Sequence, residues 1–349
     1  MKEDKTEALG LFEKYLTVWV FICMAIGTFI GWYFPGVSLT LSKLEYAQVS
    51  MPIAVLLWLM IYPMMVQIDF RKVLGIVKHP KPVLMTSFLN WGVKPWSMAI
   101  ITWVFFMVIF GSLIPEDVGR LYWAGAVILG AVPCTAMVFV WSNLAKGDPN
   151  FTLLQVAVDD LLMLVFYTPI VIFILGVSDI AIPYKTMILS VALFIGVPLV
   201  LAQFSRNYIL KRKGIEWFER VLLRAFRFIT IVALLLTLVI IFIYQGNTII
   251  NNPVHILLIA IPLTIQTFFI FGFGYGLAKF LKLNYEIAAP AAMIAASNFF
   301  EFAVAATITL FGVSSPAALA PVVGVLEEVP IMLLLVAISK RTKHIFGGK

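Results

Sequence analysis

The sequence predicts an all-α polytopic membrane protein. Of its 349 residues, 62% are hydrophobic and only 12% are charged, whereas soluble domains carry about 25% charged residues. The mean hydropathy is +1.02. The apolar residues form runs of roughly 20 or more, the length that an α-helix needs to cross the hydrocarbon core of a bilayer. These observations exclude a soluble enzyme, a disordered chain and a disulfide-stapled secreted domain.

Ten apolar runs follow one another, and no soluble domain is left between them. The first run ends in Gly-Trp-Tyr-Phe-Pro and not in a small-residue cleavage site, so we expect a retained span and not a signal peptide. Several runs are long enough to tilt or to break in the middle. The predicted spans are residues 15–34, 49–68, 83–111, 120–144, 151–176, 184–205, 221–244, 254–280, 285–311 and 317–339.

Lysine and arginine residues predict the orientation of the chain. Of 25 such residues, 21 fall on one side of the predicted spans and 3 on the other. The positive-inside rule places the richer side, which holds both termini, in the cytoplasm. The net charge of +7 reflects this distribution, so the expected partner is the lipid bilayer and not nucleic acid. The most basic connection, residues 206–227, is interpreted as an orientation signal with a possible contact to anionic lipid.

Ten spans with both ends on one side divide into two halves of five, residues 1–180 and 181–349. Because five is odd, the second half runs inverted relative to the first, as in many secondary transporters. Each half also has a polar interruption, a turn and an acidic pair in the same order. These are Cys134, Gly147, Pro149 and Asp159-Asp160 in one half, and Asn298, Gly312, Pro316 and Glu327-Glu328 in the other. We therefore predict two inverted five-helix repeats in one membrane domain.

Ionisable residues inside the predicted spans are candidates for function, because a charge at the centre of a bilayer is costly. Neighbouring residues lie about 100° apart on a helix, so at most one acid of each pair faces a common site. Asp160 and Glu328 are favoured as functional. Asp159 and Lys94, the one base within a span, fit a functional role and a structural ion pair equally well.

One span carries a signal of a break at membrane depth, and another carries a buried polar pair. Pro133 removes a backbone donor directly before Cys134, and freed backbone groups are tolerated there only beside protein or a water-filled cavity. A simple proline kink is the alternative. In the ninth span, Asn298 and Glu301 share one helix face. They could hold a proton, a cation or a polar solute, or form an interhelical hydrogen bond.

Other motifs favour packing over chemistry. Cys23 has no polar neighbour and is interpreted as a buried structural thiol. Gly27 and Gly31 form a GxxxG packing motif, and the glycines of residues 272–276 are interpreted as helix packing because no strand precedes them. Two cysteines in separate spans provide no disulfide framework and no CxxC metal site, and no cofactor is expected.

Five stretches of the sequence carry a resemblance to a known family. They are Glu13-Lys-Tyr-Leu-Thr-Val-Trp, Asn90-Trp-Gly-Val-Lys-Pro95, Pro133-Cys-Thr-Ala-Met-Val-Phe-Val-Trp-Ser-Asn-Leu-Ala-Lys-Gly-Asp148, Ser297-Asn-Phe-Phe-Glu-Phe-Ala-Val304 and Gly324-Val-Leu-Glu-Glu-Val-Pro330. Over nearly its whole length the chain resembles the arsenical-resistance-3 (Acr3) arsenite permeases of the bile acid/arsenite/riboflavin transporter superfamily. A cysteine in the fourth span together with Glu-Val-Pro in the tenth is the specific combination.

The resemblance implies ten spans, cytoplasmic termini and crossed, broken helices 4 and 9. It implies secondary active efflux of trivalent arsenite, and sometimes antimonite, across the plasma membrane, coupled to proton antiport and conferring arsenic resistance. The family's essential thiol corresponds to Cys134 and its essential glutamate, directly before Val-Pro, to Glu328. Its polar positions in spans 5 and 9 correspond to Asp160, Asn298 and Glu301.

The chemistry of arsenite agrees with these residues. Arsenite near neutral pH is an uncharged trihydroxide with a soft centre, which suits thiol sulfur. We therefore expect Cys134 to contact arsenic(III), and Asn298, Thr135 and Glu328 to complete the substrate site through the arsenic hydroxyls.

Uphill export of a neutral solute needs a coupled ion. A buried carboxyl group can take up and release a proton near neutral pH. Glu328 is the first candidate for this role, followed by Glu301 and Asp160. Proton and arsenite are expected to compete at one midplane site between the repeats.

Three other kinds of protein fit the sequence less well. A sodium-coupled symporter of organic anions such as bile acids has the same fold, but Cys134 and Glu-Val-Pro argue against it. An intramembrane enzyme is disfavoured because the sequence has no HExxH, DDxxD or nucleophile-elbow motif. A membrane receptor would need a soluble sensory or output domain, for which no residues remain.

Overall fold

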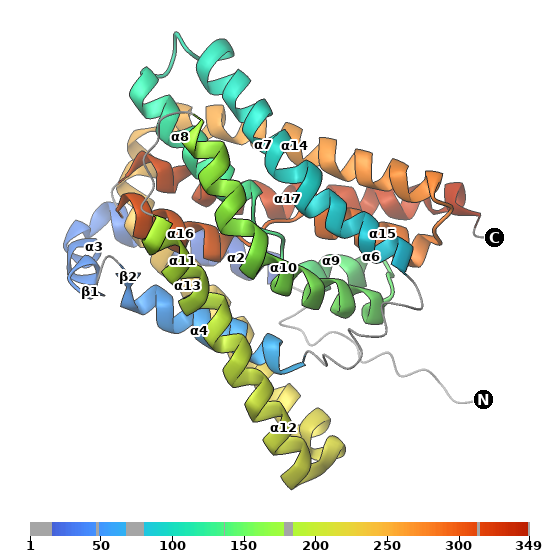
Figure 1. Ribbon diagram of the computed structural model, residues 1–349. Coiled ribbons are helices and arrows are strands. Elements are labelled where there is room, and N and C mark those ends of the chain that lie inside the picture. Colours follow the sequence, from blue (N-terminus) through green and yellow to red (C-terminus); the bar gives the residue numbers. More distant parts are fainter. Residues whose placement is uncertain are drawn as a thin grey trace.

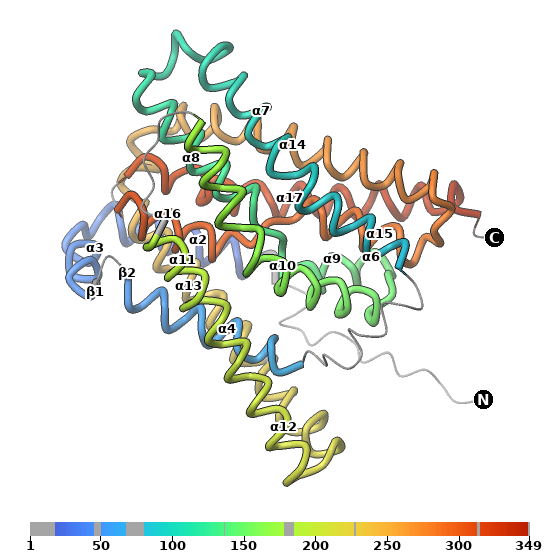
Figure 2. The backbone as a smooth tube through the Cα atoms, in the orientation of Figure 1, coloured from blue at the N-terminus to red at the C-terminus, as the bar shows by residue number. Residues whose placement is uncertain are grey.

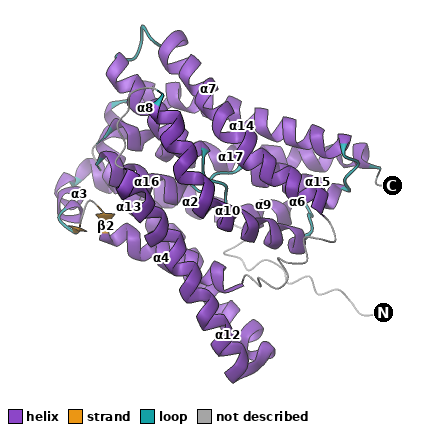
Figure 3. Cartoon of the chain, viewed as in Figure 1, coloured by secondary structure: helices purple, strands orange, loops and turns teal. Residues whose placement is uncertain are grey.

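The computed structural model describes residues 16–46, 49–67, 80–135, 137–177, 184–312 and 315–347, and these are almost entirely helical (Figures 1 and 3). Two short strands, β1 (Glu45–Tyr46) and β2 (Val49–Ser50), form one antiparallel pair. By length and composition, five of the described helices could cross a membrane, or six if the segments Val18–Tyr33 and Pro35–Ser42, bent by 95°, count as one span. The predicted all-α, multi-pass membrane protein is confirmed.

The first half of the chain contains four long helical stretches and two short helices that meet at a break. Its helices are α2 (Leu16–Tyr33), α3 (Pro35–Ser42), α4 (Met51–Gln67), α6 (Pro80–Ser87), the π-helical η2 (Phe88–Val93), α7 (Lys94–Trp103), the π-helical η3 (Val104–Ile109), α8 (Glu116–Gly130), α9 (Val138–Leu144) and α10 (Pro149–Gly176). Asp148 caps α10 by accepting from the backbone N–H of Asn150 at 2.7 Å, and Pro149 suits the first helical position, where no backbone donor is needed.

The second half also contains two short helices that meet at a break. Its helices are α11 (Tyr184–Val191), the π-helical η4 (Ala192–Gly196), α12 (Val197–Trp217), the π-helical η5 (Phe218–Leu222), α13 (Leu223–Asn251), α14 (Pro253–Phe280), α15 (Tyr285–Ala296), α16 (Phe300–Phe311), the 3₁₀ turn η6 (Pro316–Ala318), α17 (Leu319–Arg341) and the 3₁₀ turn η7 (Lys343–Phe346).

The connection predicted after residue 205 is wrong in one respect, because α12 continues as a helix to Trp217. Figure 2 shows this helix projecting away from the rest of the molecule. Buried Arg206 donates to the carbonyl oxygens of Val66 at 3.0 Å and Gln67 at 3.3 Å. Arg206 therefore caps the end of α4, in addition to any orientation signal. The chain turns at Gly214, whose φ of +78° is readily adopted only by glycine.

Helices α2, α4, α12 and α13 form one packed group, in which α13 contacts α2 and α4, and α4 contacts α12. A Cβ on Gly31 would lie 2.2 Å from the carbonyl oxygen of Ile243, and one on Gly27 would lie 2.6 Å from that of Val239. The predicted packing role of this GxxxG motif is confirmed. Cys23, interpreted as buried, is only partly buried.

The remaining helices form a second group around the two breaks. In it α7 contacts α8 and α14, α14 contacts α15 and α17, and α17 contacts α8. A Cβ on Gly274 would lie 2.9 Å from the Leu89 side chain, whereas Gly272 and Gly276 have nothing within 4 Å. The predicted packing role of residues 272–276 therefore holds for Gly274 alone.

Candidate functional site

The site is built on two interrupted helices. The halves α8, α9, α15 and α16 contain 15, 7, 12 and 12 residues, and each is shorter than the roughly 20 residues of a full span. The extended segments between the halves pair through an antiparallel bridge of Pro133 with Asn298. The backbone N–H of Phe299 also donates to the carbonyl oxygen of Val132 at 3.4 Å. Both spans are therefore broken, and the fourth is not a simple proline kink.

Small residues bring these backbones close together. A Cβ on Gly125 of α8 would lie 2.0 Å from the carbonyl oxygen of Ala317, and one on Gly147 would lie 2.1 Å from the Pro290 ring. Such close approach between helices is typical of small residues in membrane proteins. Gly125 of α8 and Gly147 after α9 thus allow close packing on η6 and α15, beside the two breaks.

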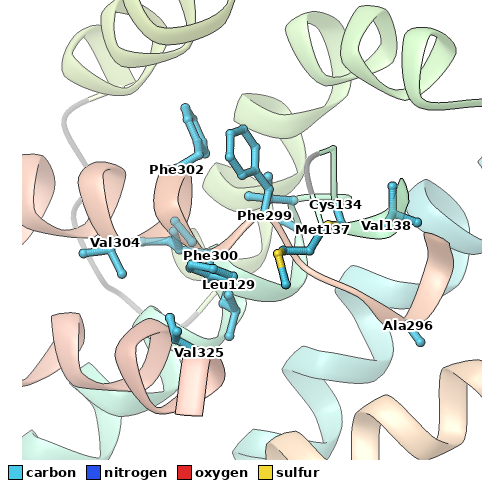
Figure 4. Close-up of a cluster of buried hydrophobic side chains, with 14 of the residues drawn as sticks. Leu129, Cys134, Met137, Val138, Ala296, Phe299, Phe300, Phe302, Val304 and Val325 are labelled. Atoms are coloured by element: carbon cyan, nitrogen blue, oxygen red, sulfur yellow. The ribbon is translucent and has the colours of Figure 1, made fainter. Parts of the chain in front are cut away.

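Cys134 and Thr135 lie in the first break, and each is 1% exposed. In Figure 4, Cys134 and Met137 lie beside Phe299 of the second break, with Ala296 at the end of α15. Pro133, directly before Cys134, pairs with Asn298 of the second break, so the buried thiol lies where the two breaks meet. The first break therefore contributes a sulfur and the Thr135 hydroxyl, and the second contributes Ser297 and Asn298.

Ser297 links the second break to the tenth span. Its hydroxyl donates a hydrogen bond to Oε1 of Glu328, whereas Oε2 of Glu328 has no hydrogen-bond partner among the described residues. Nε1 of buried Trp141 on α9 likewise has no hydrogen-bond partner within the described part of the chain. Ser297 is not among the residues predicted from the sequence, although it directly precedes Asn298 in one of the family-like stretches.

Further unpaired polar atoms lie at the start of α16. Asn298 and Glu301 are 4% and 1% exposed, and their Oδ1 and Oε1 atoms have no hydrogen-bond partner in the described part of the chain. Glu301 and Glu328 interact electrostatically. Buried polar atoms are ordinarily hydrogen-bonded, so these acceptors suit a polar solute or a proton.

The two acids of each pair have different surroundings. Asp159 accepts from Asn90 at 2.9 Å, Gln155 at 3.1 Å and Trp91 at 3.3 Å. Glu327 accepts from Thr264 and, at 3.4 Å, from Thr267. These first acids are thus fixed to a neighbouring helix. The second acids differ, because Glu328 bonds to the break and Oδ2 of Asp160 has no partner among the described residues.

Lys94 is fully buried and lies between the breaks. Its Nζ donates to the carbonyl oxygen of Ser297 at 2.6 Å and to that of Val132 at 3.4 Å. Among the described residues the side-chain ion pairs lie at the surface, Arg120 with Glu116 and Arg220 with Glu216. The interpretation of Lys94 and Asp159 as a structural ion pair is therefore wrong, because backbone carbonyls freed by the breaks take the lysine.

The structure brings together five of the six predicted site residues, Cys134, Thr135, Asn298, Glu301 and Glu328, on the breaks and the helices beside them. Asp160 lies on α10 next to Asp159, and its Oδ2 has no hydrogen-bond partner in the described ranges. In the part of the chain that the structure describes, no group of three His, Cys, Asp or Glu side chains could hold a metal ion. The site is closed, so a solute can reach it only after the helices move.

Comparisons with a family model and with individual proteins point to the same family. The model of the sodium bile acid symporter family matches residues 54–252. The chain is 57% identical over 340 residues to the arsenical-resistance protein Acr3 of Alkaliphilus metalliredigens, an alignment that covers 97% of this chain and 95% of the relative. It is 32% identical over 341 residues to the Acr3 protein of Corynebacterium glutamicum, with 95% and 90% covered.

An uncharacterized transporter of Synechocystis is 47% identical over 347 residues, with 97% of this chain and 91% of the relative covered. Members of the symporter family and Acr3 proteins are transporters and not enzymes. The chain therefore belongs to the sodium bile acid symporter family and, within it, to the Acr3 proteins.

Proposed function

We propose that the protein exports trivalent arsenite from the cell in exchange for protons and so confers arsenical resistance. The observation that carries this proposal is the pairing of the two breaks, which places the Cys134 thiol of one half of the chain beside the break whose Ser297 donates to the Glu328 carboxyl group of the other half. A soft sulfur ligand beside a titratable carboxyl group is the chemistry that a proton-coupled arsenite carrier requires. The identity to two proteins named arsenical-resistance protein supports it.

The proposed architecture is two inverted five-helix repeats, residues 1–180 and 181–349, each with a broken fourth span. The contacts between helices support it. In an inverted repeat, a contact between a helix of the first half and a helix of the second half should recur between their counterparts. The contact of α2 with α13 corresponds to that of α12 with α4, and the contact of α8 with α16 corresponds to that of α15 with α9. The boundary between the two repeats lies outside the described residues.

We propose that the protein lies in the cell membrane with both termini in the cytoplasm. Support comes from the distribution of basic residues and from Lys340 and Arg341 in the last turn of α17. The basic residues at the N-terminus and after the second span, Lys2, Lys5, Lys14, Arg71, Lys72 and Lys78, lie outside the described residues.

In the proposed site, arsenic contacts the sulfur of Cys134. The arsenic hydroxyls then donate to Asn298 and Glu328, whose Oδ1 and Oε2 atoms lack partners in the closed structure, and Thr135 lies in the same break. One thiol gives an exchangeable contact, which suits turnover. Antimonite, also a neutral trihydroxide, would be accepted by the same groups.

Coupling follows if a proton and arsenite compete for these acceptors. Protonation of Glu328 removes an acceptor for an arsenic hydroxyl, and arsenite binding favours the unprotonated form. Glu301, which interacts electrostatically with Glu328, and Asp160 are the second candidates. Because the two ligands exclude each other, inward proton movement is exchanged for outward arsenite movement.

Arsenite uptake into everted membrane vesicles tests this proposal. Wild type should accumulate arsenite while a proton gradient is present and release it when the gradient is collapsed. At arsenite concentrations below half-saturation of wild type and at normal protein levels, Cys134→Ser and Glu328→Gln should lose accumulation, whereas the matched thiol control Cys23→Ser should retain it. Normal accumulation by Cys134→Ser would remove the arsenite assignment from this site.

A sodium-coupled organic anion symporter is the second candidate, because the family model that matches residues 54–252 is that of sodium bile acid symporters. Sodium-dependent uptake of taurocholate by right-side-out vesicles tests it. Uptake that requires sodium and is indifferent to Cys134→Ser would favour this candidate over arsenite export.

A further inference from the structure

Lys94 occupies an unusual position for a charged side chain. It begins α7, directly after the π-helical turn η2, and it is completely buried. Its ammonium nitrogen lies 2.6 Å from the carbonyl oxygen of Ser297 and 3.4 Å from that of Val132. Ser297 follows α15 and Val132 follows α8, so one cation contacts the C-terminal ends of both half-helices.

These carbonyls form a site that attracts a cation. The C-terminal end of a helix carries a partial negative charge, and a carbonyl freed by a break at membrane depth must find a partner inside the protein. The carboxyl groups of Glu328 and Asp159 and the thiol of Cys134 also interact electrostatically with Lys94. The carbonyls of both breaks and two carboxyl groups therefore favour a cation at this position.

In secondary transporters with broken helices, unwound carbonyls and half-helix C-terminal ends coordinate the coupling sodium or proton. The family of this chain is described by sodium symport, yet here a side chain supplies the positive charge. An ammonium group has three donors and no acceptor, so it can satisfy the two carbonyls as a metal cation would.

We propose that the Lys94 ammonium is a built-in cation that fills a latent alkali-cation site between the two breaks, and that it makes transport by this chain independent of sodium and potassium. Only the second part of this inference, that transport is independent of sodium and potassium, rests on the proposed function. Truncating the Lys94 side chain should leave a space in which a free cation can bind. Replacing it with an uncharged side chain of similar length should leave no such space.

Two variants separate these effects. Lys94→Ala opens the space that the side chain fills, and n-propylammonium contains the atoms that this substitution removes. Lys94→Met keeps a long side chain in place without the charge. The melting temperature of purified wild type and both variants is measured at equal ionic strength in chloride salts of N-methylglucamine, sodium, potassium and n-propylammonium.

Sodium or potassium, and n-propylammonium, should raise the melting temperature of Lys94→Ala in a saturable manner, while wild type and Lys94→Met respond equally to all four salts. The site would also be supported if Lys94→Ala stayed folded only in salts of those cations. The proposal fails if Lys94→Ala shows no cation preference, if it folds in none of the salts while Lys94→Met folds, or if wild type itself prefers an alkali cation.

Transport is the second readout. Lys94→Ala should transport arsenite at least about tenfold more slowly than wild type in N-methylglucamine, as expected when hydrogen bonds to a buried charge are lost, and the cation that stabilises it should restore the rate. Lys94→Met should stay slow in every salt. If wild type transports no arsenite, the proposed function fails while the melting temperatures still decide the cation site.

Discussion

The break between α8 and α9 and the break between α15 and α16 pair with each other at Pro133 and Asn298. Their side chains differ. The first break carries the thiol of Cys134, whereas the second carries Ser297 and Asn298, with Glu301 one residue into α16. Two paired breaks thus carry unequal chemistry, in which one half supplies a thiol and the other supplies polar and carboxyl groups.

The acidic pairs extend this comparison. Asp159 and Glu327 are each held by residues of a neighbouring helix, while Glu328 bonds to the break and Asp160 keeps an unpaired oxygen. A carboxylate that already accepts several hydrogen bonds gains little from a proton or a solute. We therefore expect the second acid of each pair to take part in transport and the first to be a structural group.

The largest expected difference is between the two acids of α17. Glu328→Gln should abolish gradient-driven arsenite accumulation, because an amide cannot cycle a proton. Glu327→Gln keeps an acceptor for Thr264 and should retain accumulation with a lower melting temperature. Arsenite accumulation by both variants is measured in everted vesicles that contain equal amounts of the protein. Loss of coupling in Glu327→Gln with retention in Glu328→Gln would reverse the assignment of the two roles.

A second test separates the chemistry of the two breaks. Cys134→Ser should raise the arsenite concentration for half-maximal transport, about tenfold for each 1.4 kcal/mol of sulfur affinity lost. Asn298→Ala should weaken binding less, because it removes one acceptor. Arsenite-dependent proton movement, followed with a fluorescent pH indicator inside the vesicles, should persist in Cys134→Ser at saturating arsenite. Its disappearance there would mean that the thiol contributes to coupling itself.

A third comparison concerns Asp159 and Asp160. Asp159→Ala leaves donors of Asn90, Trp91 and Gln155 unpaired in a buried position, and an unsatisfied buried group costs about 1–3 kcal/mol. Asp160→Ala removes a carboxylate with an unpaired oxygen and should cost less stability. Thermal unfolding in detergent measures both. Equal melting temperatures would contradict a structural role that is limited to Asp159.

Several parts of this arrangement follow from the sequence. Apolar runs of membrane-spanning length predict the helices, and Pro133 predicts the interruption of the fourth span because it lacks a backbone donor. The break in the ninth span is implied only by the family resemblance, since Asn298 and Glu301 alone predict a shared helix face, whereas Asn298 lies before α16. The GxxxG motif predicts the close contact of α2, although not that α13 is its partner.

Other parts depend on three-dimensional packing. The rotation of α17, which directs Glu327 to Thr264 and Glu328 to Ser297, is set by contacts between distant helices. The partners of Lys94 are backbone carbonyls, which any sequence provides and only a break exposes. Sequence spacing therefore indicates the acids and the lysine as candidates, but not which groups they contact.

The smallest expected effects come from the turns that follow the two breaks. Gly147→Ala would place a Cβ 2.1 Å from the Pro290 ring, so the docking of this turn on α15 must shift, at about 1–3 kcal/mol for overpacking. Gly312 has open space, but its φ of +86° and ψ of 156° are essentially restricted to glycine, at about 1–3 kcal/mol for another residue. Thermal unfolding should therefore show similar losses in Gly147→Ala and Gly312→Ala for different reasons. A double variant with Pro290→Ala should recover part of the loss in Gly147→Ala and none in Gly312→Ala, and equal recovery in both would mean that backbone strain and not the Pro290 contact limits the first turn.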